Sequence, residues 1–263
     1  KYLTNVIMSK DMKVENKKPL SDLEVKPLPT DKTDLPQSPY AEKNIIAKFP
    51  SMTLVIGRSG SGKTTIVNYM LTQPNYLKDF FHEIYLFSPT AEIDDLAKHL
   101  KLKKENLVTD PTEEKLSDII ESQKNLVKKH GIKKVGKNKR VLIILDDIVS
   151  SVKFLKSPTM LKLATMARHY MISSFVSTQS YTKIPRAVRL QANGLILLPS
   201  SQDEVKLVCD DMAPPHCRKK DFLQLIEYAT QNKHEFLYVN NFDTEHKFRK
   251  GFKEYLNMKP SKY

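Results

Sequence analysis

One short glycine-rich segment constrains the fold of this chain more than any other part of its sequence. Residues 57–64 read Gly-Arg-Ser-Gly-Ser-Gly-Lys-Thr and match the pattern G-x-x-x-x-G-K-[ST] at every fixed position. The segment follows the apolar run Met52–Ile56 and precedes Lys63–Leu71, which is typical of a helix. This order predicts a phosphate-binding loop, because backbone N–H groups then converge on an anion at the helix N-terminus. A plain turn between a strand and a helix is the alternative interpretation.

The residues of this loop have separate expected roles. We expect Lys63 to reach the β- and γ-phosphates of a nucleoside triphosphate, and the Thr64 hydroxyl to complete the shell of a Mg²⁺ ion. The Arg58 side chain is expected to point away from the phosphates and has no role of its own. The predicted nucleotide-binding residues are Gly57, Arg58, Ser59, Gly60, Ser61, Gly62, Lys63, Thr64 and Thr65.

A pair of carboxylates follows about eighty residues after the loop. The five aliphatic residues Val141–Leu145 end in Asp146 and Asp147. Asp146 is expected to hold Mg²⁺ through water, and Asp147 lies where a base that polarises the attacking water would stand. Asp147 could instead cap the following turn. Glutamate is commoner at this second position, and aspartate is one methylene shorter.

Further apolar runs alternate with helical patterns along the chain. Strands are predicted at Glu83–Phe87, Ser173–Ser177, Leu195–Leu198 and Glu235–Val239. Helices are predicted at Ala91–Leu100, Glu113–His130 and Pro158–Tyr170. Uninterrupted apolar strands that alternate with helices are typical of a parallel sheet with both faces covered. The sequence therefore predicts an α/β fold with a mostly parallel sheet and helices on both faces.

Composition distinguishes the ends of the chain from its middle. Residues 1–44 contain no glycine, and their prolines, Pro39 among them, predict an extended, partly disordered arm. Residues 45–245 form the predicted P-loop core, and residues 246–263 a basic C-terminal tail. The net charge of +13 favours a polyanionic partner. No run of 18 apolar residues occurs, so no membrane span is predicted.

The cysteines indicate a reducing, intracellular compartment. One disulfide between Cys209 and Cys217 could not stabilise a fold of this size. No apolar core of signal-peptide type follows the N-terminus. Their spacing, with His216 between them, lacks the C-x₂₋₄-C pair of a zinc site.

Several segments resemble one known family. Phe49–Thr65 is similar to the entry of the ATPase core of virus genome-packaging ATPases, which belong to the FtsK–HerA group of P-loop translocases and occur in poxviruses, other large DNA viruses and virophages. Ile84–Thr90 resembles their second strand, and Leu145–Asp147 their acidic strand end. The most specific segment, Ser177–Arg189, resembles a strand that ends in a sensor glutamine and is followed by a proline-containing turn and a basic helix. The resemblance covers about residues 47–200.

The resemblance implies a RecA/FtsK-like P-loop NTPase that hydrolyses ATP, with Mg²⁺, to move double-stranded DNA into a preformed capsid. It implies a homo-oligomeric ring of six or five subunits at a capsid or portal-like vertex, located in the host cell cytoplasm (the virus factory) or in the virion. Gln179 then corresponds to a sensor of the γ-phosphate or the attacking water, although it could merely cap its strand. The sensor strand should lie between the phosphate-loop strand and the acidic strand.

A ring motor of this kind also needs an arginine that reaches the neighbouring subunit's site. Arg168, in an arginine–histidine pair similar to the family's, is the favoured candidate; Arg186 and Arg189 are the others. A solvated helix face explains any of the three without chemistry.

The densest positive patch is Lys124–Arg140, with eight Lys or Arg in seventeen residues. It could contact DNA phosphates, or form a solvated loop. It precedes a strand, whereas ligand loops of open α/β sheets follow strands, so it is not expected to form the pore. A small-molecule kinase and a nucleotide-gated assembly switch remain the alternative functions.

Overall fold

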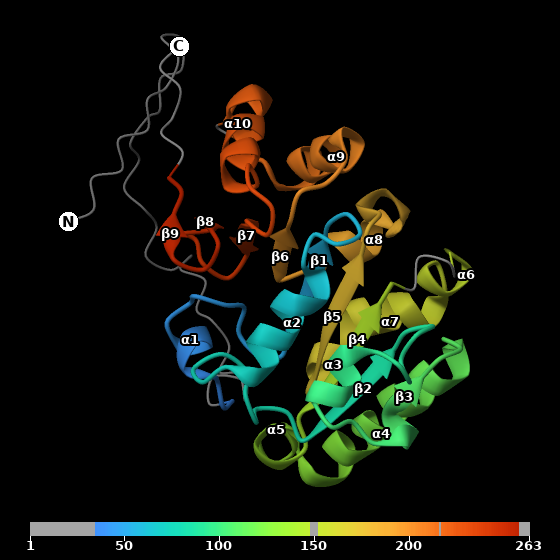
Figure 1. The fold of residues 1–263 in the computed structure, drawn as a ribbon. Helices are drawn as coiled ribbons and strands as arrows, with labels where there is room; N and C mark the ends of the chain where they lie inside the picture. The colour runs from blue at the N-terminus through green and yellow to red at the C-terminus, as the bar shows by residue number, and fades with distance from the viewer. Residues whose placement is uncertain (1–34, 148–151, 216, 258–263) are drawn as a thin grey trace, which may run out of the picture. The chain divides into compact units, whose positions relative to one another are not determined.

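A computed structural model describes residues 35–147, 152–215 and 217–257. Within them the strands form one sheet in the order β3-β2-β4-β5-β1-β6-β7-β8-β9 (Figure 1). The strands are β1 Met52–Ile56, β2 Glu83–Phe87, β3 Leu107–Val108, β4 Val141–Asp146, β5 Ile172–Thr178, β6 Gly194–Leu197, β7 Leu237–Asn240, β8 Phe248–Lys250 and β9 Glu254–Tyr255.

The six strands from β3 to β6 in this order run parallel, and β7, β8 and β9 extend the sheet in antiparallel pairing. The prediction of a mostly parallel sheet is confirmed, and β5 lies between β1 and β4 as the resemblance implied. Asp146 is in register with Ser177, and Ile56 with both Thr178 and Leu197. The carboxyl ends of β4, β5, β1 and β6 therefore meet along one side of the sheet, which we call the carboxyl edge. The opposite side is the amino edge.

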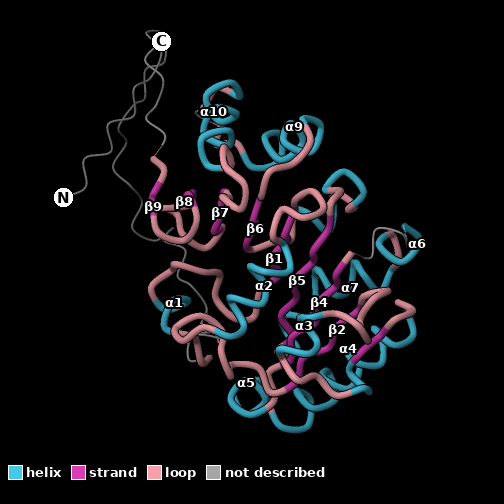
Figure 2. Tube along the Cα trace, viewed as in Figure 1, coloured by secondary structure: helices cyan, strands magenta, loops and turns pink. Residues whose placement is uncertain are grey.

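Helices lie on both faces of the sheet (Figure 2). They are α1 Pro39–Glu42, α2 Lys63–Thr72, α3 Asp95–His99, α4 Glu113–His130, α5 Ile132–Asn138, α6 Val152–Leu155, α7 Pro158–Met166, α8 Arg186–Arg189, α9 Gln202–Met212 and α10 Lys219–Ala229, with 3₁₀ turns at Lys104–Asn106, Ala167–Tyr170 and Tyr181–Lys183. The longest of them, α4, begins where the Thr112 hydroxyl accepts from the Lys115 N–H and ends at Gly131. Both ends follow from the ordinary preferences of helix caps.

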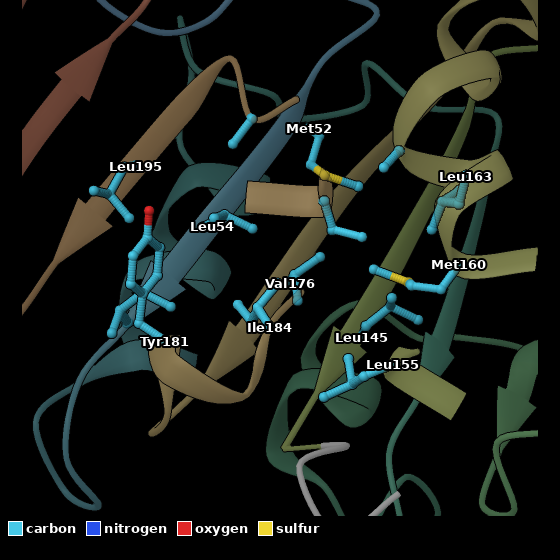
Figure 3. Packing of buried hydrophobic residues seen from close by; sticks show 14 of the residues in the cluster. Met52, Leu54, Leu145, Leu155, Met160, Leu163, Val176, Tyr181, Ile184 and Leu195 are labelled. Carbon is cyan, nitrogen blue, oxygen red and sulfur yellow. The ribbon is translucent and has the colours of Figure 1, made fainter. Parts of the chain in front are cut away.

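The alternation of side chains along each strand builds two cores. Leu54 of β1 and Leu145 of β4 face α4 and α6–α10, whereas Val55 and Ile144 on the same strands face α1, α2 and α3. Figure 3 shows the first core, where Met160 of α7 points toward the strands. Because both faces are covered, β1 and β4 are nearly continuous apolar runs, whereas β5 buries small hydroxyl residues such as Ser174 and Ser177 among its apolar ones.

Two sequence predictions at the ends of the core are wrong. Residues 39–42 form α1 instead of an extended arm, because Pro39 takes the first helical position, where its missing N–H has no partner to lose. Residues 248–255, predicted as part of a basic tail, form β8 and β9. The Arg249 side chain is 1% exposed and its Nη2 lies 2.8 Å from the Asp243 carboxylate. The rest of the predicted arm, residues 1–34, lies outside the described residues.

Other differences concern helices. The sequence did not predict α5, α6, α9 and α10, and α3 is shorter than expected. Within the described part of the chain, no helix combines the length and the apolar character needed to cross a membrane.

Candidate nucleotide site

The glycine-rich loop connects β1 to α2 at the centre of the carboxyl edge. The Gly57 N–H donates to the Thr178 carbonyl of β5 at 3.2 Å, and the Arg58 N–H donates to the Pro199 carbonyl after β6, also at 3.2 Å. The loop is thus fixed to the strands on both sides of β1. Gly62 has φ +105°, a left-handed conformation that side chains rarely adopt, and this turn directs the chain into α2.

The Lys63 side chain folds back over the loop. Its Nζ donates to the carbonyl oxygens of Gly57 at 3.0 Å and Arg58 at 3.3 Å. Burial lowers the pKa of Lys63, and the charges of Asp147 and Asp146 partly offset this effect. The ammonium group is therefore already held among the groups that would surround a phosphate, with two carboxylates balancing its charge.

Asp146 ends β4 and is buried. Burial raises the pKa of Asp146, and the charges of Asp94 and Asp147 add to this effect, whereas the Ser177 hydroxyl and the charge of Lys63 partly offset it. The Asp146 carboxylate and the Thr64 hydroxyl are oxygen donors of the kind that Mg²⁺ prefers, so their chemistry fits the predicted metal. Among the described residues, however, no cluster of three or more acidic, histidine or cysteine side chains is placed to hold an ion. Sequence reasoning missed Asp94, which caps α3 by accepting the Leu96 N–H at 2.8 Å.

Asp147 and Gln179, which are far apart in the sequence, lie side by side. The Gln179 Nε2 lies 3.3 Å from Asp147 Oδ2 and 3.5 Å from Oδ1, and both side chains are exposed at the carboxyl edge. Asp147 has φ +50°, and its N–H donates to the Ser177 carbonyl at 3.0 Å. A left-handed residue other than glycine stores strain, which is common at functional sites. The backbone bond to Ser177 holds the Asp147 carboxylate facing the Gln179 amide.

The three candidate arginines have different surroundings. Arg168 is exposed in the 3₁₀ turn that precedes β5, so it lies at the amino edge, away from the loop of its own chain. Arg186 is exposed on α8. Arg189 is buried: its Nε lies 2.7 Å from the Asp211 carboxylate, and its guanidinium stacks over the Tyr181 ring at 4.9 Å. Arg189 therefore stabilises the fold, and the sequence prediction that it could reach a neighbouring subunit is wrong.

His234 contacts the loop and was missed by the sequence analysis. It lies in the turn between α10 and β7, and its Nδ1 is 2.9 Å from the Ser61 carbonyl oxygen. Because a carbonyl only accepts, Nδ1 is the protonated nitrogen. A Cβ added to Gly62 would lie 2.9 Å from the same Nδ1. No sequence signal near residue 234 marks this contact, since its partner is 173 residues away.

The basic run lies mainly on α4 and α5 and reaches β4 at the amino edge. Arg140 donates to the carbonyl oxygens of Phe80 and Lys137 and stacks over the Phe80 ring at 4.4 Å. The Lys124 Nζ lies 2.8 Å from the Glu121 carboxylate. These two residues stabilise the fold, and the run is remote from the phosphate loop.

The fold is similar to solved viral and bacterial ATPases. The genome packaging NTPase B204 from Sulfolobus turreted icosahedral virus 2 in complex with AMP gives a TM-score of 0.56 at 14% identity, over 76% of this chain and 96% of that one. The complex of B204 with ATP-gammaS gives a TM-score of 0.52 at 15% identity, over 79% of this chain and 98% of that one. The cytoplasmic domain of the Thermomonospora curvata type VII secretion ATPase EccC gives 0.50 at 12% identity, over 80% and 24%. At these identities the likeness establishes the fold, that of a P-loop NTPase.

Sequence comparison identifies the family. The uncharacterized protein 075L of Invertebrate iridescent virus 6 is 22% identical over 162 residues, which are 62% of this chain and 59% of that protein. Residues 38–245 match the family described as "Poxvirus A32 protein". This match includes the phosphate loop, both aspartates and Gln179. The chain therefore belongs to the Poxvirus A32 protein family, and the resemblance inferred from its sequence is confirmed at that level.

Proposed function

We propose that the chain is an ATP-driven translocase that packages double-stranded viral DNA into a preformed capsid. The observation that carries the proposal is the meeting of Lys63, Asp146, Asp147 and Gln179 at one carboxyl edge in a member of this family. The structural likeness to B204, a genome packaging NTPase from another virus, adds support.

The proposed chemistry uses groups that are already oriented. Lys63 exchanges its two loop carbonyls for the β- and γ-phosphates, and Asp147 accepts a proton from the attacking water. Gln179 donates to Asp147 at 3.3 Å and can donate instead to the γ-phosphate or the water, so it can report whether the phosphate is present. Thr64 and Asp146 would hold a Mg²⁺ ion, which when bound would supply positive charge against the phosphates.

We assign the arginine that acts on the neighbouring subunit to Arg168. The strand β5 separates it from the loop of its own chain by seven residues, about 20 Å at the usual rise per residue. An exposed arginine at the amino edge can reach only another copy's site, which is the geometry that a head-to-tail ring requires. Arg186, exposed on α8, remains the second candidate.

A steady-state ATPase assay with and without double-stranded DNA tests the proposal. We expect DNA to stimulate hydrolysis with little sequence preference, to lose this effect as salt rises, and to have no effect on Lys63→Ala, whose rate should fall about a hundredfold or more. A rate that DNA leaves unchanged at low salt, in a protein that binds ATP, would contradict the proposal.

The same samples separate the alternative functions. A small-molecule kinase would form a phosphorylated metabolite, whereas the translocase forms ADP and free phosphate. A nucleotide-gated switch would stop after one turnover per subunit, whereas the translocase continues. The proposal includes a packaging ring of six or five subunits. It also places this ring at the capsid, in the virus factory or the virion.

A further inference from the structure

The phosphate loop has two unlike sides. On one side stand β5 and β4, which carry Gln179, Asp147 and Asp146. On the other side stand β6 and β7, and no acidic or amide side chain lines the cavity that opens there among the described residues. The γ-phosphate must face the first side, because the groups that act on it are there. The α-phosphate, the ribose and the base must therefore extend toward the second side.

A cavity of about 370 Å³ lies on that second side and is open to solvent. Gly62 and Thr65 of the loop form one wall, and Tyr69 continues this wall one turn along α2. His234, Phe236 and Phe252 complete the lining, and His234 also contacts the loop through the Ser61 carbonyl. The lining is mostly carbon, although it adjoins the most polar loop of the molecule.

Aromatic rings dominate the lining and hold one another in place. Phe236 and Phe252 meet edge to face with ring centroids 5.1 Å apart, and Phe252 contacts Tyr76 at 5.3 Å. Tyr76 in turn meets Tyr69 at 5.3 Å. Tyr69 is nevertheless 47% exposed and lines the cavity, so part of its surface is available to a ligand. Rigid aromatic surfaces with a free face are what stacked nucleobases require.

We propose that this cavity binds the base of the nucleotide, with Tyr69 as a stacking surface and with Phe236, Phe252 and His234 as further lining. The inference rests on the proposed nucleotide chemistry and adds the base site to it. Stacking depends on the area of the ring, so purine nucleotides bind more tightly than pyrimidine nucleotides and than bare tripolyphosphate. Segments that flank the antiparallel strands β7 and β8 supply His234, Phe236 and Phe252 to the site.

Equilibrium binding of a non-hydrolysable ATP analogue and of inorganic tripolyphosphate tests the base site. Tyr69→Leu keeps an apolar side chain but removes the aromatic ring, and its thermal unfolding, measured beside that of the native protein, shows whether the variant is folded. We expect this variant to bind the analogue about tenfold more weakly, with tripolyphosphate unchanged within twofold. The matched control is Phe242→Leu, an aromatic side chain of similar exposure (44%) after β7 at the amino edge, which should change neither affinity.

The other possible results of the binding measurements would contradict the base site. If Tyr69→Leu leaves the analogue's affinity unchanged, or weakens both ligands equally, the base does not stack there. If the native protein binds the analogue and tripolyphosphate equally well, the phosphates alone are recognised and the base site is absent, while the proposed function stands. If it binds neither, the proposed function fails as well, and this inference with it.

Photo-crosslinking with 8-azido-ATP gives a positional test that needs no substitution. The label is expected on the peptide that contains Tyr69 or on residues 232–252. Labelling confined to peptides from α3 or α6, on the side of the acidic residues, would overturn the proposal.

Discussion

Replacing Arg189 tests whether this arginine stabilises the fold or takes part in ATP hydrolysis. Its Nε lies 2.7 Å from the Asp211 carboxylate, and the two side chains are only 7% and 6% exposed. Its Nη1 also donates to the Ile184 carbonyl at 2.7 Å. Arg189→Ala leaves a buried carboxylate without its cation, a change that costs about 3–5 kcal/mol in the free energy of unfolding.

The loss is measurable as a shift in thermal or urea unfolding. For a domain of this size, 3–5 kcal/mol corresponds to a fall in Tm of roughly 6–20 °C. Arg186→Ala, three residues earlier on the same short helix but exposed, is the control and should change the free energy of unfolding by less than about 0.5 kcal/mol.

A double variant identifies the cause. Adding Asp211→Asn to Arg189→Ala removes the uncompensated charge, so it should recover part of the lost stability. The reasoning is refuted if Arg189→Ala unfolds within about 1 kcal/mol of the native protein but loses its ATPase activity. That result would return Arg189 to the candidates for the arginine that acts between subunits.

Three further predictions concern the loop and its carboxylates. Asp147→Asn should slow single-turnover hydrolysis about 10²–10⁴-fold with nucleotide affinity nearly unchanged, because asparagine also tolerates φ +50°; undiminished hydrolysis would exclude Asp147 as the base. The raised pKa of Asp146 means that the folded state binds this proton more tightly than the unfolded state. Stability of the nucleotide-free protein should therefore fall as pH rises from about 4 through the raised pKa, and urea unfolding at several pH values should show that Asp146→Asn removes this fall. Gly62→Ala should lower the free energy of unfolding by about 1–3 kcal/mol, since φ is +105° and the new Cβ meets His234, and adding His234→Gly should recover only the part due to the clash.

The parallel part of the fold could be predicted because its signals are local. The apolar runs at β1 and β2 and the caps of α4 reproduce the observed bounds, since each depends on neighbouring residues alone. The meeting of Asp147 with Gln179 was also predictable in outline, because parallel strands bring their carboxyl ends to one edge. The left-handed backbone of Asp147, which orients its carboxylate, has no sequence signature.

The C-terminal part was predicted less well for two different reasons. In α9 the sequence does carry a helical pattern, because the apolar residues Val208, Cys209 and Met212 are buried at helical spacing. In β8 the signal was misleading, since Lys247 to Lys250 look like a basic tail until Asp243 is seen to pair with Arg249. Arg249 can be buried in β8 because it pairs with Asp243 and donates to the carbonyl oxygens of Asn44 and Ile45. The alternation of polar and apolar residues along a strand cannot reveal such partners.

The contact between His234 and the Ser61 carbonyl has a consequence for synthesis of the chain. A ribosome synthesises the phosphate loop and all of the parallel strands before it makes residue 234, because the last of these strands, β6, ends at Leu197. A nascent chain can therefore complete the parallel sheet while its loop still lacks this contact. Closing so long a segment is slow compared with forming local turns. The loop therefore acquires its final surroundings only when β7 docks, so the last strands to be translated complete one of the first elements to be made.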